Sequence, residues 1–345
     1  MGPAEYLEAK TLNGKWKVVK KLAKPAGTGG NFSTGYIVED GSGRKAFLKA
    51  MDYESAFKSK DHVRELNALT SAYLFEKNVC EKCSTAKLNR VVHAIDTFTV
   101  QADPNNSFSK VECLVFELAD GDIRAHLSAA AAFDLAFVLR AIHNVATAMD
   151  QLHRHDIAHQ DLKPSNVLVF GKDIGSKVSD FGRAWSKDFR NAHDNDTIAG
   201  DYGYAPPELL YNYVYPDENI RRYGCDTYLL GNLAVYLTTS VNMSSLIIQH
   251  LNHSHFPYTW SGTYVTVLPY VQAAYGLALE EFRKSLPTVV ERDMLEMVSY
   301  LCQPDPTKRG HPQNRTGHTN QFGLERFVSC FNLLAVRAEV TLAGK

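Results

Sequence analysis

The sequence predicts an α+β protein of two lobes: a small β-rich lobe with one helix, followed by a larger helical lobe. In the first third of the chain, apolar residues have the two-residue spacing of β-strands at 16–22, 35–40 and 45–51. The glycine-containing stretches "GTGG" and "DGSG" separate these strands. After "LADGD" at 118–122 the spacing becomes helical, and helical segments fill most of 207–340. The 345 residues suffice for one large or two modest domains.

The remaining elements follow from the same periodicities. One helix is expected at 61–76, where apolar residues recur every three or four positions: Val63, Leu66, Leu69 and Tyr73. Two strands near 91–100 and 112–118 flank the turn "DPNNS". The first helix of the large lobe presents one apolar face: Val138, Ile142, Val145, Met149 and Leu152. We place the lobes at 1–117 and 118–345 and expect a ligand cleft between them.

Composition excludes several classes of protein. The chain is 45% apolar and 22% charged with a net charge of -1, which argues against disorder and against a globally basic nucleic-acid-binding protein. The lysine-rich stretch at 15–24 alternates with apolar residues and is interpreted as the solvated face of a strand. No stretch approaches the roughly 20 apolar residues of a membrane span, and "MGPAEYLEAK" lacks the order of a secretory signal. We therefore expect no nucleic-acid or membrane partner.

The cysteines indicate a reducing environment. Six cysteines spread over this length do not form a disulfide framework, so the cytoplasm is the expected location. Cys80 and Cys83 form one CxxC pair, but a zinc site needs two more ligands, and no second pair of suitable spacing is present. The pair is expected to be two free thiols on a loop.

Polar residues then follow one another in a recognisable order. They are Lys49 in "AFLKA", Glu65 on the first helix, His159, Asp161, Lys163 and Asn166 in "AHQDLKPSNVLVF", Asp180 in "DFG", Glu208 in "APPE", Asp226 in "DTYLLG" and Arg309 in "DPTKR". Taken singly, Lys49, Glu65 and Asp180 would be interpreted as surface charges and His159 as a satisfied core histidine. Together, from about residue 16 to 340, the seven motifs resemble the eukaryotic-type protein kinase family.

The resemblance implies a nucleotide site for ATP. Lys49 would hold the α- and β-phosphates, and Glu65 would orient that lysine by pairing with it. Leu168 would form the floor under the base, and Glu117 and Ala119 beside the connector are assigned to the same site. The expected cosubstrate is therefore ATP.

It also implies the chemistry of phosphoryl transfer to protein substrates. Asp161 would accept or orient the proton of a substrate hydroxyl, and Lys163 would lie near the transferred phosphate, as is typical of Ser/Thr kinases. Asn166 and Asp180 would bind Mg²⁺ through hard oxygen atoms.

Three further residues would have supporting roles. In the family, the aspartate at the position of Asp226 braces the catalytic loop from a buried helix. An ion pair at the positions of Glu208 and Arg309 clamps the activation segment, a task for which the planar guanidinium suits a carboxylate.

The glycine-rich loop departs from the family pattern. When "NFSTGYIVED" is aligned with the family pattern, Gly30 matches the position of one family glycine, and Gly29 is next to it. A shifted register is also possible. In that register Gly35 replaces the valine that covers the adenine. Phe47, on the same strand face as Lys49, replaces a small alanine. We hypothesise that Phe47 covers the base; the alternative is that it is lobe core and occludes the pocket.

The activation segment, 180–208, departs from the pattern as well. It ends "GDYGYAPPE", so Asp201 replaces a threonine whose hydroxyl bonds to the catalytic Asp and Lys in Ser/Thr kinases. An acid at this position could pair with Lys163 or repel Asp161, which affects substrate preference and basal activity. Thr197 lies where a regulatory phosphothreonine could lie, or is an ordinary exposed loop residue.

Gln160 bears on regulation. The family's usual arginine before the catalytic Asp helps bind a phosphorylated activation loop, and a neutral amide cannot make that charge-assisted bidentate contact. We predict that activity does not depend on phosphorylation of Thr197.

Two other functions stay open at this point. One is a pseudokinase that acts as a nucleotide-binding or scaffolding module, favoured by the irregular glycine loop, Phe47 and Asp201. The other is a small-molecule kinase of the aminoglycoside-phosphotransferase type, disfavoured by "APPE", "DTYLLG" and Arg309. The stretch 240–290 matches no motif and is expected to be ordinary structure of the large lobe. Oligomeric state and physiological substrate are not predicted.

Overall fold

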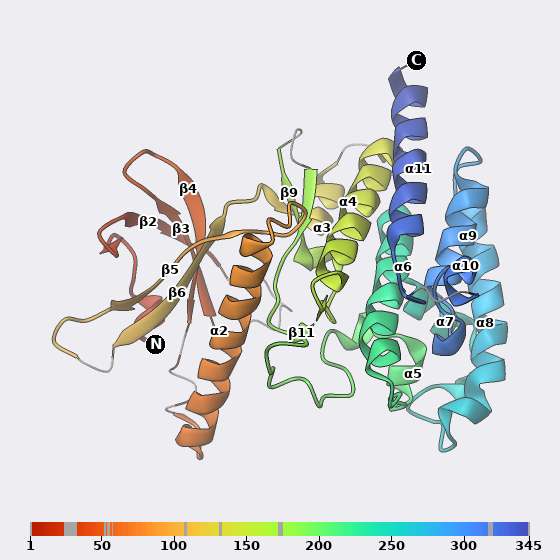
Figure 1. Ribbon diagram of the computed structural model, residues 1–345, viewed down its shortest axis with the longest axis horizontal. Helices are drawn as coiled ribbons and strands as arrows, with labels where there is room; N and C mark the ends of the chain where they lie inside the picture. The colour runs from red at the N-terminus through yellow and green to blue at the C-terminus, as the bar shows by residue number, and fades with distance from the viewer. Residues whose placement is uncertain are drawn as a thin grey trace. The chain divides into compact units, whose positions relative to one another are not determined.

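The chain divides into two compact units. The computed structural model describes residues 2–23, 33–51, 53, 56, 58–106, 109–130, 133–171, 175–316 and 320–343. Unit 1 comprises Met1–Asp120 with the short pieces Asp180–Gly182 and Phe189–Ala192, and unit 2 comprises the remainder. Unit 1 is β-rich and unit 2 is helical, as predicted (Figure 1).

Unit 1 is built on an antiparallel sheet with the strand order β1-β2-β3-β4-β6-β5. Its strands are β1 (Thr11–Leu12), β2 (Trp16–Lys21), β3 (Ser33–Glu39), β4 (Lys45–Met51), β5 (Ala94–Gln101) and β6 (Lys110–Glu117). Burial alternates strictly along β3 and along most of β4, as expected for strands whose two faces differ. The predicted strands at 35–40 and 45–51 are confirmed within a residue or two at their ends.

One face of this sheet carries the buried core of unit 1. Residues Tyr36, Val38, Ala46, Leu48 and Val115 on that face pack with apolar residues of the first 20 positions. The 3₁₀ turn η1 (Pro3–Glu5) is held there because the Tyr36 hydroxyl donates to the carbonyl of Ala4 at 2.6 Å. The opposite face carries the functional side chains described below.

The helix of unit 1, α2 (His62–Thr85), begins after Asp61, whose carboxylate accepts from the backbone N–H of Arg64 at 3.1 Å. It continues nine residues beyond the predicted end at 76. The "CEKC" cysteines Cys80 and Cys83 therefore lie in this helix, each 1% exposed, and the prediction of a loop was wrong. Both are free thiols, and the described residues contain no group of three or more His, Cys, Asp or Glu side chains arranged to hold a metal ion.

Unit 2 is a set of helices with two small sheets among its described residues, β10-β9-β7 and β11-β8. The helices are α3 (Ile123–Ala129), α4 (Leu135–His153), α5 (Pro207–Leu210), α6 (Gly224–Thr239), α7 (Met243–His250), α8 (Tyr264–Ser285), α9 (Glu291–Leu301), α10 (Pro312–Arg315) and α11 (Glu325–Ala343). The strands are β7 (Gly121–Asp122), β8 (Ile157–Ala158), β9 (Val167–Phe170), β10 (Gly175–Val178) and β11 (Trp185–Ser186). Short 3₁₀ turns are η2 (Pro164–Asn166), η3 (Tyr202–Tyr204), η5 (His253–His255) and η6 (Pro306–Lys308), and η4 (Asn219–Tyr223) is a π-helical turn.

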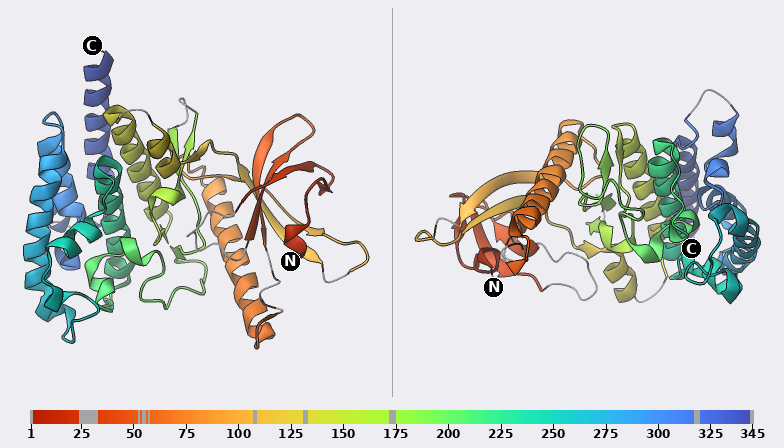
Figure 2. Two further views of the ribbon diagram at one scale, coloured as in Figure 1. Left: turned by 180° about the vertical axis from the view of Figure 1, so that it is seen from behind. Right: turned by 90° about the horizontal axis from the view of Figure 1, so that it is seen from below.

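The interior of unit 2 lies around α4 and α6. All five residues of the predicted apolar face of α4 are at most 1% exposed, which confirms that helix. Helix α6 packs against α4, α7, α8 and α9, and α11 lies along α4 in both figures (Figure 1, Figure 2). The stretch 240–290 is largely helical, in α7 and α8. Among the described residues, no helix is long and apolar enough to cross a membrane.

Candidate active site

Lys49 forms a buried ion pair on the functional face of the unit 1 sheet. It lies on β4, and its Nζ is 2.7 and 2.8 Å from the two carboxylate oxygens of Glu76 on α2. The side chain of Glu76 is 6% exposed and that of Lys49 is 20% exposed. An ion pair of this kind fixes the ammonium in position and keeps it charged.

The predicted partner, Glu65, was therefore wrong. Glu65 and Glu76 lie on the same helix eleven residues apart, which is about 16 Å along the axis at 1.5 Å per residue. Eleven residues are close to three full turns, so both carboxylates lie on nearly the same helix face. Glu65 is half-buried in the first turn of α2, too far along the helix to reach Lys49.

The sequence did carry a signal for Glu76. The buried stripe of α2 contains Leu69, Tyr73, Val79, Cys80 and Cys83, and Glu76 is a charged residue in that apolar stripe. A buried carboxylate is rarely left unpaired, so its position pointed to a cationic partner.

Asp180 completes a cluster of three charges. Its carboxylate lies 3.8 Å from Nζ of Lys49, and it also accepts from the backbone N–H of Gly182 at 3.4 Å. Its backbone is left-handed, with φ 65°, and the following Phe181 is buried at 2% exposure. Burial by itself would lower the pKa of Lys49, but the carboxylates of Glu76 and Asp180 outweigh it, so the pKa is raised and the lysine stays protonated.

Phe47 occupies the space beside Gly35 on the face that carries Lys49. In the sheet register, Gly35 is opposite Lys49 and Phe47 is opposite Phe116. A Cβ built on Gly35 would lie 2.9 Å from Cε2 of Phe47, so a larger residue at 35 would require the ring to move. Phe47 is half-buried and lies on the face opposite to the buried core. The large side chain at position 47 thus lies in the space beside the missing side chain at position 35. The covering of a base by Phe47 stays a prediction.

The other residues assigned to the nucleotide site are Gly29, Gly30, Glu117, Ala119 and Leu168. Gly29 and Gly30 lie outside the described residues. Glu117 ends β6, is half-buried, and accepts from the backbone N–H of His93 at 2.8 Å. Ala119 is half-buried in the connector, and Leu168 is half-buried on β9 of unit 2. Their contact with a base stays a prediction.

In unit 2 the carboxylate of Asp161 is surrounded by hydrogen-bond donors. Its Oδ1 accepts from the backbone N–H of Asp201 at 2.9 Å, and its Oδ2 accepts from Nδ2 of Asn166 at 3.1 Å. Nζ of Lys163 lies 3.2 Å from the same Oδ2. The structure thus brings together the predicted acid, cation and amide of "AHQDLKPSNVLVF", and these bonds hold the carboxylate in one orientation.

The side-chain amide of Asn166 is oriented by its contacts with Asp161. Its Nδ2 donates to both the backbone carbonyl (2.8 Å) and the carboxylate of Asp161, which fixes the orientation of the amide. The only hydrogen bond recorded to its Oδ1 among the described residues is a long one, 3.5 Å from the Ser165 hydroxyl. An amide oxygen and the carboxylate of Asp180 are the donor types that suit Mg²⁺.

Asp226 braces this loop from inside unit 2. It is 0% exposed on α6, and its two oxygens accept from the backbone N–H groups of His159 (2.6 Å) and Gln160 (2.8 Å). The ring of His159 accepts from the N–H of Asp161 at 3.3 Å and contacts the carbonyl of Ser179 at 3.0 Å. Because a carbonyl only accepts and an N–H only donates, His159 is the neutral Nε2–H tautomer. The predicted bracing role of Asp226 is confirmed.

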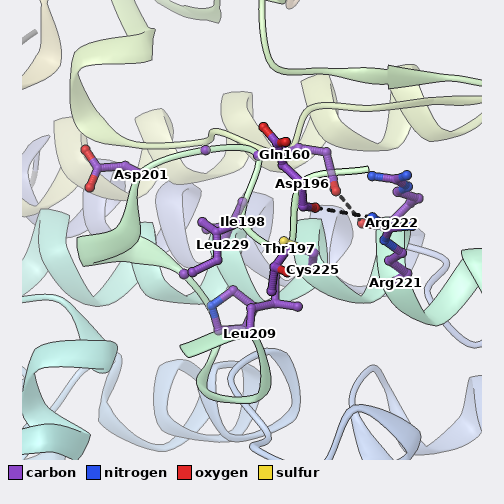
Figure 3. Close-up of a pocket in the computed structure, with 14 residues that line it drawn as sticks. Gln160, Asp196, Thr197, Ile198, Asp201, Leu209, Arg221, Arg222, Cys225 and Leu229 are labelled. Atoms are coloured by element: carbon purple, nitrogen blue, oxygen red, sulfur yellow. Dashed lines mark hydrogen bonds between the residues drawn. The ribbon is translucent and has the colours of Figure 1, made fainter. Parts of the chain in front are cut away.

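Gln160 is a buried connecting residue. It is 7% exposed, its φ is 63°, and its side-chain Nε2 donates to the carbonyl of Arg222 at 2.9 Å and to Asp226 at 3.2 Å. It also lines a small cavity together with Thr197, Arg221 and Arg222 (Figure 3). A neutral amide thus stands where the family has a cation, and it donates to one carbonyl and one carboxylate.

Asp201 pairs with the lysine of the loop. Its Oδ2 is 3.4 Å from Nζ of Lys163, which places Lys163 between the carboxylates of Asp161 and Asp201. Of the two outcomes considered, pairing with Lys163 and repulsion of Asp161, the structure has the pairing. Burial by itself would lower the pKa of Lys163, but Asp161 and Asp201 outweigh it and raise the pKa.

Gly200 lets the activation segment approach the catalytic loop closely. A Cβ at Gly200 would lie 2.3 Å from the carbonyl oxygen of Gln160 and 2.8 Å from Oδ1 of Asp161. The end of the segment is fixed by Glu208 and Arg309, whose two hydrogen bonds are both 2.8 Å long at 4% and 0% exposure. The predicted bidentate pair is confirmed.

Comparison with known proteins agrees with this geometry. A family model described as "Protein kinase domain" matches residues 22–319. An Aurora kinase of Debaryomyces hansenii is 34% identical over 113 residues, which are 33% of this chain and 26% of that protein. A calcium and calcium/calmodulin-dependent serine/threonine-protein kinase of Pisum sativum is 26% identical over 202 residues, 56% of this chain and 36% of that protein.

A probable serine/threonine-protein kinase of Bifidobacterium longum is 23% identical over 258 residues, 72% of this chain and 30% of that protein. The matched regions therefore cover between 26% and 36% of the length of these three relatives.

Proposed function

The chain belongs to the protein kinase family, and on that premise we propose that it transfers the γ-phosphate of ATP to serine or threonine hydroxyls of protein substrates. The observation that carries this proposal is the ion pair between Lys49 and Glu76, with Asp180 3.8 Å from the same ammonium. The family uses such a lysine on the α- and β-phosphates and such an aspartate on Mg²⁺.

Each residue has a task in this proposal. Lys49, held by Glu76, would neutralise phosphate charge, and Asn166 and Asp180 would each offer an oxygen atom to Mg²⁺. Bound Mg²⁺ supplies further charge neutralisation on the phosphates. Asp161, held by the N–H of Asp201 and the amide of Asn166, orients the substrate hydroxyl and accepts its proton.

The positive charge of Lys163 suits the transferred phosphate. The contact of Lys163 with Asp201, however, supports an alternative function, a pseudokinase. An acid that shares this lysine with Asp161 reduces the positive charge offered to a phosphate. The alternative is a pseudokinase that binds nucleotide or a partner without transfer. The bidentate pair of Glu208 and Arg309 favours a protein substrate over a small molecule, since the family uses it to build its peptide-docking platform.

The test is transfer from γ-labelled ATP, with Mg²⁺, to the chain itself and to a general protein substrate. The expected result is label on serine or threonine that is lost in Asp161→Ala, while nucleotide binding, measured by calorimetry, persists in that variant. Nucleotide binding without any label in the parent chain would establish the pseudokinase.

We further propose that transfer does not require phosphorylation of the activation segment. The support is Gln160, whose neutral amide donates to the carbonyl of Arg222 and to the carboxylate of Asp226 and carries no charge for a phosphate. Thr197→Ala is expected to keep activity within about twofold, because it removes one hydroxyl and one methyl group from a half-buried side chain and leaves the contacts of Gln160 in place. A large loss in that variant, with recovery on phosphorylation of the parent protein, would contradict this.

A further inference from the structure

Two adjacent arginines hold the middle of the activation segment by its backbone. Arg222 donates to the carbonyl of Asp194 at 2.6 Å, and Arg221 donates to the same carbonyl at 2.8 Å. Arg221 also reaches the carbonyl of Asp196 at 3.2 Å. Both arginines lie on η4, the turn that leads into α6, and Figure 3 shows them beside Asp196 and Thr197.

The contacts of Arg222 leave it little freedom. Its side chain is 4% exposed, its Nε donates to Glu218 at 2.8 Å, and its guanidinium lies 5.8 Å from the ring centre of Trp185. Trp185 belongs to the first part of the activation segment and Asp194 to the middle. One buried cation therefore contacts both parts, and a planar guanidinium has enough donors for these contacts at once.

Arg222 also connects the segment to the catalytic loop. Its backbone carbonyl accepts from Nε2 of Gln160 at 2.9 Å, and the backbone N–H of Gln160 is held by Asp226 at 2.8 Å. Two hydrogen bonds of Arg222, one through its side chain and one through its backbone carbonyl, thus link Asp194 to Gln160, the residue before Asp161. Figure 3 shows the contact between Gln160 and Arg222.

From this arrangement we propose that Arg221 and Arg222 are positioning residues that hold residues 194–196 in place without a phosphate, and that Gln160 couples them to the catalytic loop. The proposal rests on the proposed transferase function for its kinetic consequence, but its structural part does not. The arginines donate to main-chain carbonyls, which are neutral acceptors, in place of a phosphate group. They form this contact while Thr197 is unmodified.

The test compares Arg222→Gln and Arg221→Gln with the matched control Arg190→Gln, which removes the same charge from an exposed residue of the activation segment. Hydrogen exchange of the amides in 194–200 is measured first. Loss of a charge-assisted hydrogen bond is expected to accelerate this exchange about tenfold or more in Arg222→Gln and less in Arg221→Gln, with no change in Arg190→Gln. Arg221 is the more exposed of the pair, at 16% against 4%, so its variant is the safeguard if Arg222→Gln does not fold.

The kinetic readout is the separation of kcat from the KM for ATP. We expect kcat to fall about tenfold in Arg222→Gln with KM for ATP within about twofold, because the Lys49 ion pair is untouched, and Arg222→Lys to recover part of kcat. Unchanged exchange in both arginine variants would overturn the proposal, as would a tenfold rise of kcat on phosphorylation of Thr197. If the parent chain transfers no phosphate, the transferase function fails while the exchange experiment still decides the role of the arginines.

Discussion

Replacing Glu76 with glutamine tests which acidic residue of α2 serves Lys49. The substitution keeps the size of the side chain and one acceptor oxygen, but it removes the charge that faces Nζ at 2.7 and 2.8 Å. The matched control is Glu65→Gln, which makes the same chemical change three turns earlier on the same helix.

The magnitude follows from the burial of the pair. Hydrogen bonds to charged groups contribute about 1.5–3 kcal/mol, against about 1 kcal/mol for neutral ones. With Glu76 only 6% exposed, water cannot replace the lost carboxylate, so we expect a net loss of about 1.5–3 kcal/mol in the positioning of Lys49. At 1.36 kcal/mol per factor of ten, kcat/KM for ATP falls roughly tenfold to a hundredfold in Glu76→Gln.

The assay is the initial rate of transfer from γ-labelled ATP at several ATP concentrations, with nucleotide affinity measured separately by calorimetry. Glu65→Gln is expected to stay within about twofold of the parent, because its side chain is far from Lys49 and substitutions away from key contacts change free energies by about 0.5 kcal/mol or less. If Glu65→Gln loses as much activity as Glu76→Gln, or if neither variant changes kcat/KM or affinity, the assignment of Glu76 is refuted.

Three further substitutions concern the activation segment. Gly200→Ala places a methyl group 2.8 Å from Oδ1 of Asp161 and should lower kcat about tenfold or more, because the activation segment must move away from the catalytic loop. Circular dichroism should stay unchanged, and full activity would show that the segment relaxes freely. Glu208→Gln leaves the fully buried guanidinium of Arg309 without its counter-charge and should lower the free energy of unfolding by about 3 kcal/mol or more, measured by urea denaturation; a loss below about 1 kcal/mol would contradict this. In Asp201→Asn the pKa of Lys163 falls toward its ordinary value. Because the pKa of Lys163 is higher in the folded than in the unfolded chain, its ion pair contributes its full stability below a pH of about 10.4, the ordinary lysine pKa. This contribution disappears as the pH rises through the folded-state pKa. The stability difference between parent and Asp201→Asn should therefore be constant at neutral pH and shrink above about pH 10.4, and a difference that grows with pH would refute the pairing.

Much of the fold and part of the site could be predicted from local sequence. The two-residue alternation at 45–51 predicted a strand with Lys49 and Phe47 on one face, and the structure has both there. The cluster of Asp161, Lys163 and Asn166 was predictable because the three residues lie within six positions of one loop. Short-range spacing fixes which side chains can meet when few backbone torsions separate them.

The partner of Lys49 is a different case. Apolar spacing identified the buried face of α2, but that face recurs every three or four residues along the helix. The pattern therefore shows which residues share the buried face and does not show which turn of the helix lies beside a given strand. Which turn of α2 lies beside β4 depends on how the whole helix packs against the sheet. The helix also ran on to Thr85, past the predicted end at 76. Glu76 is 27 residues from Lys49 in sequence, and tertiary packing chose it over Glu65.

The same division holds for the activation segment. By itself, the sequence determined that Gln160 is neutral and that Asp201 is an acid, and therefore which contacts these residues cannot make. Only the tertiary structure decided that Gln160 bonds to Arg222, that Asp201 pairs with Lys163, and that Arg221 and Arg222 hold carbonyls some 25 to 28 residues earlier in the chain. The physical reason is that a side chain's chemistry is local, whereas its partner is set by the folding of distant segments onto one another.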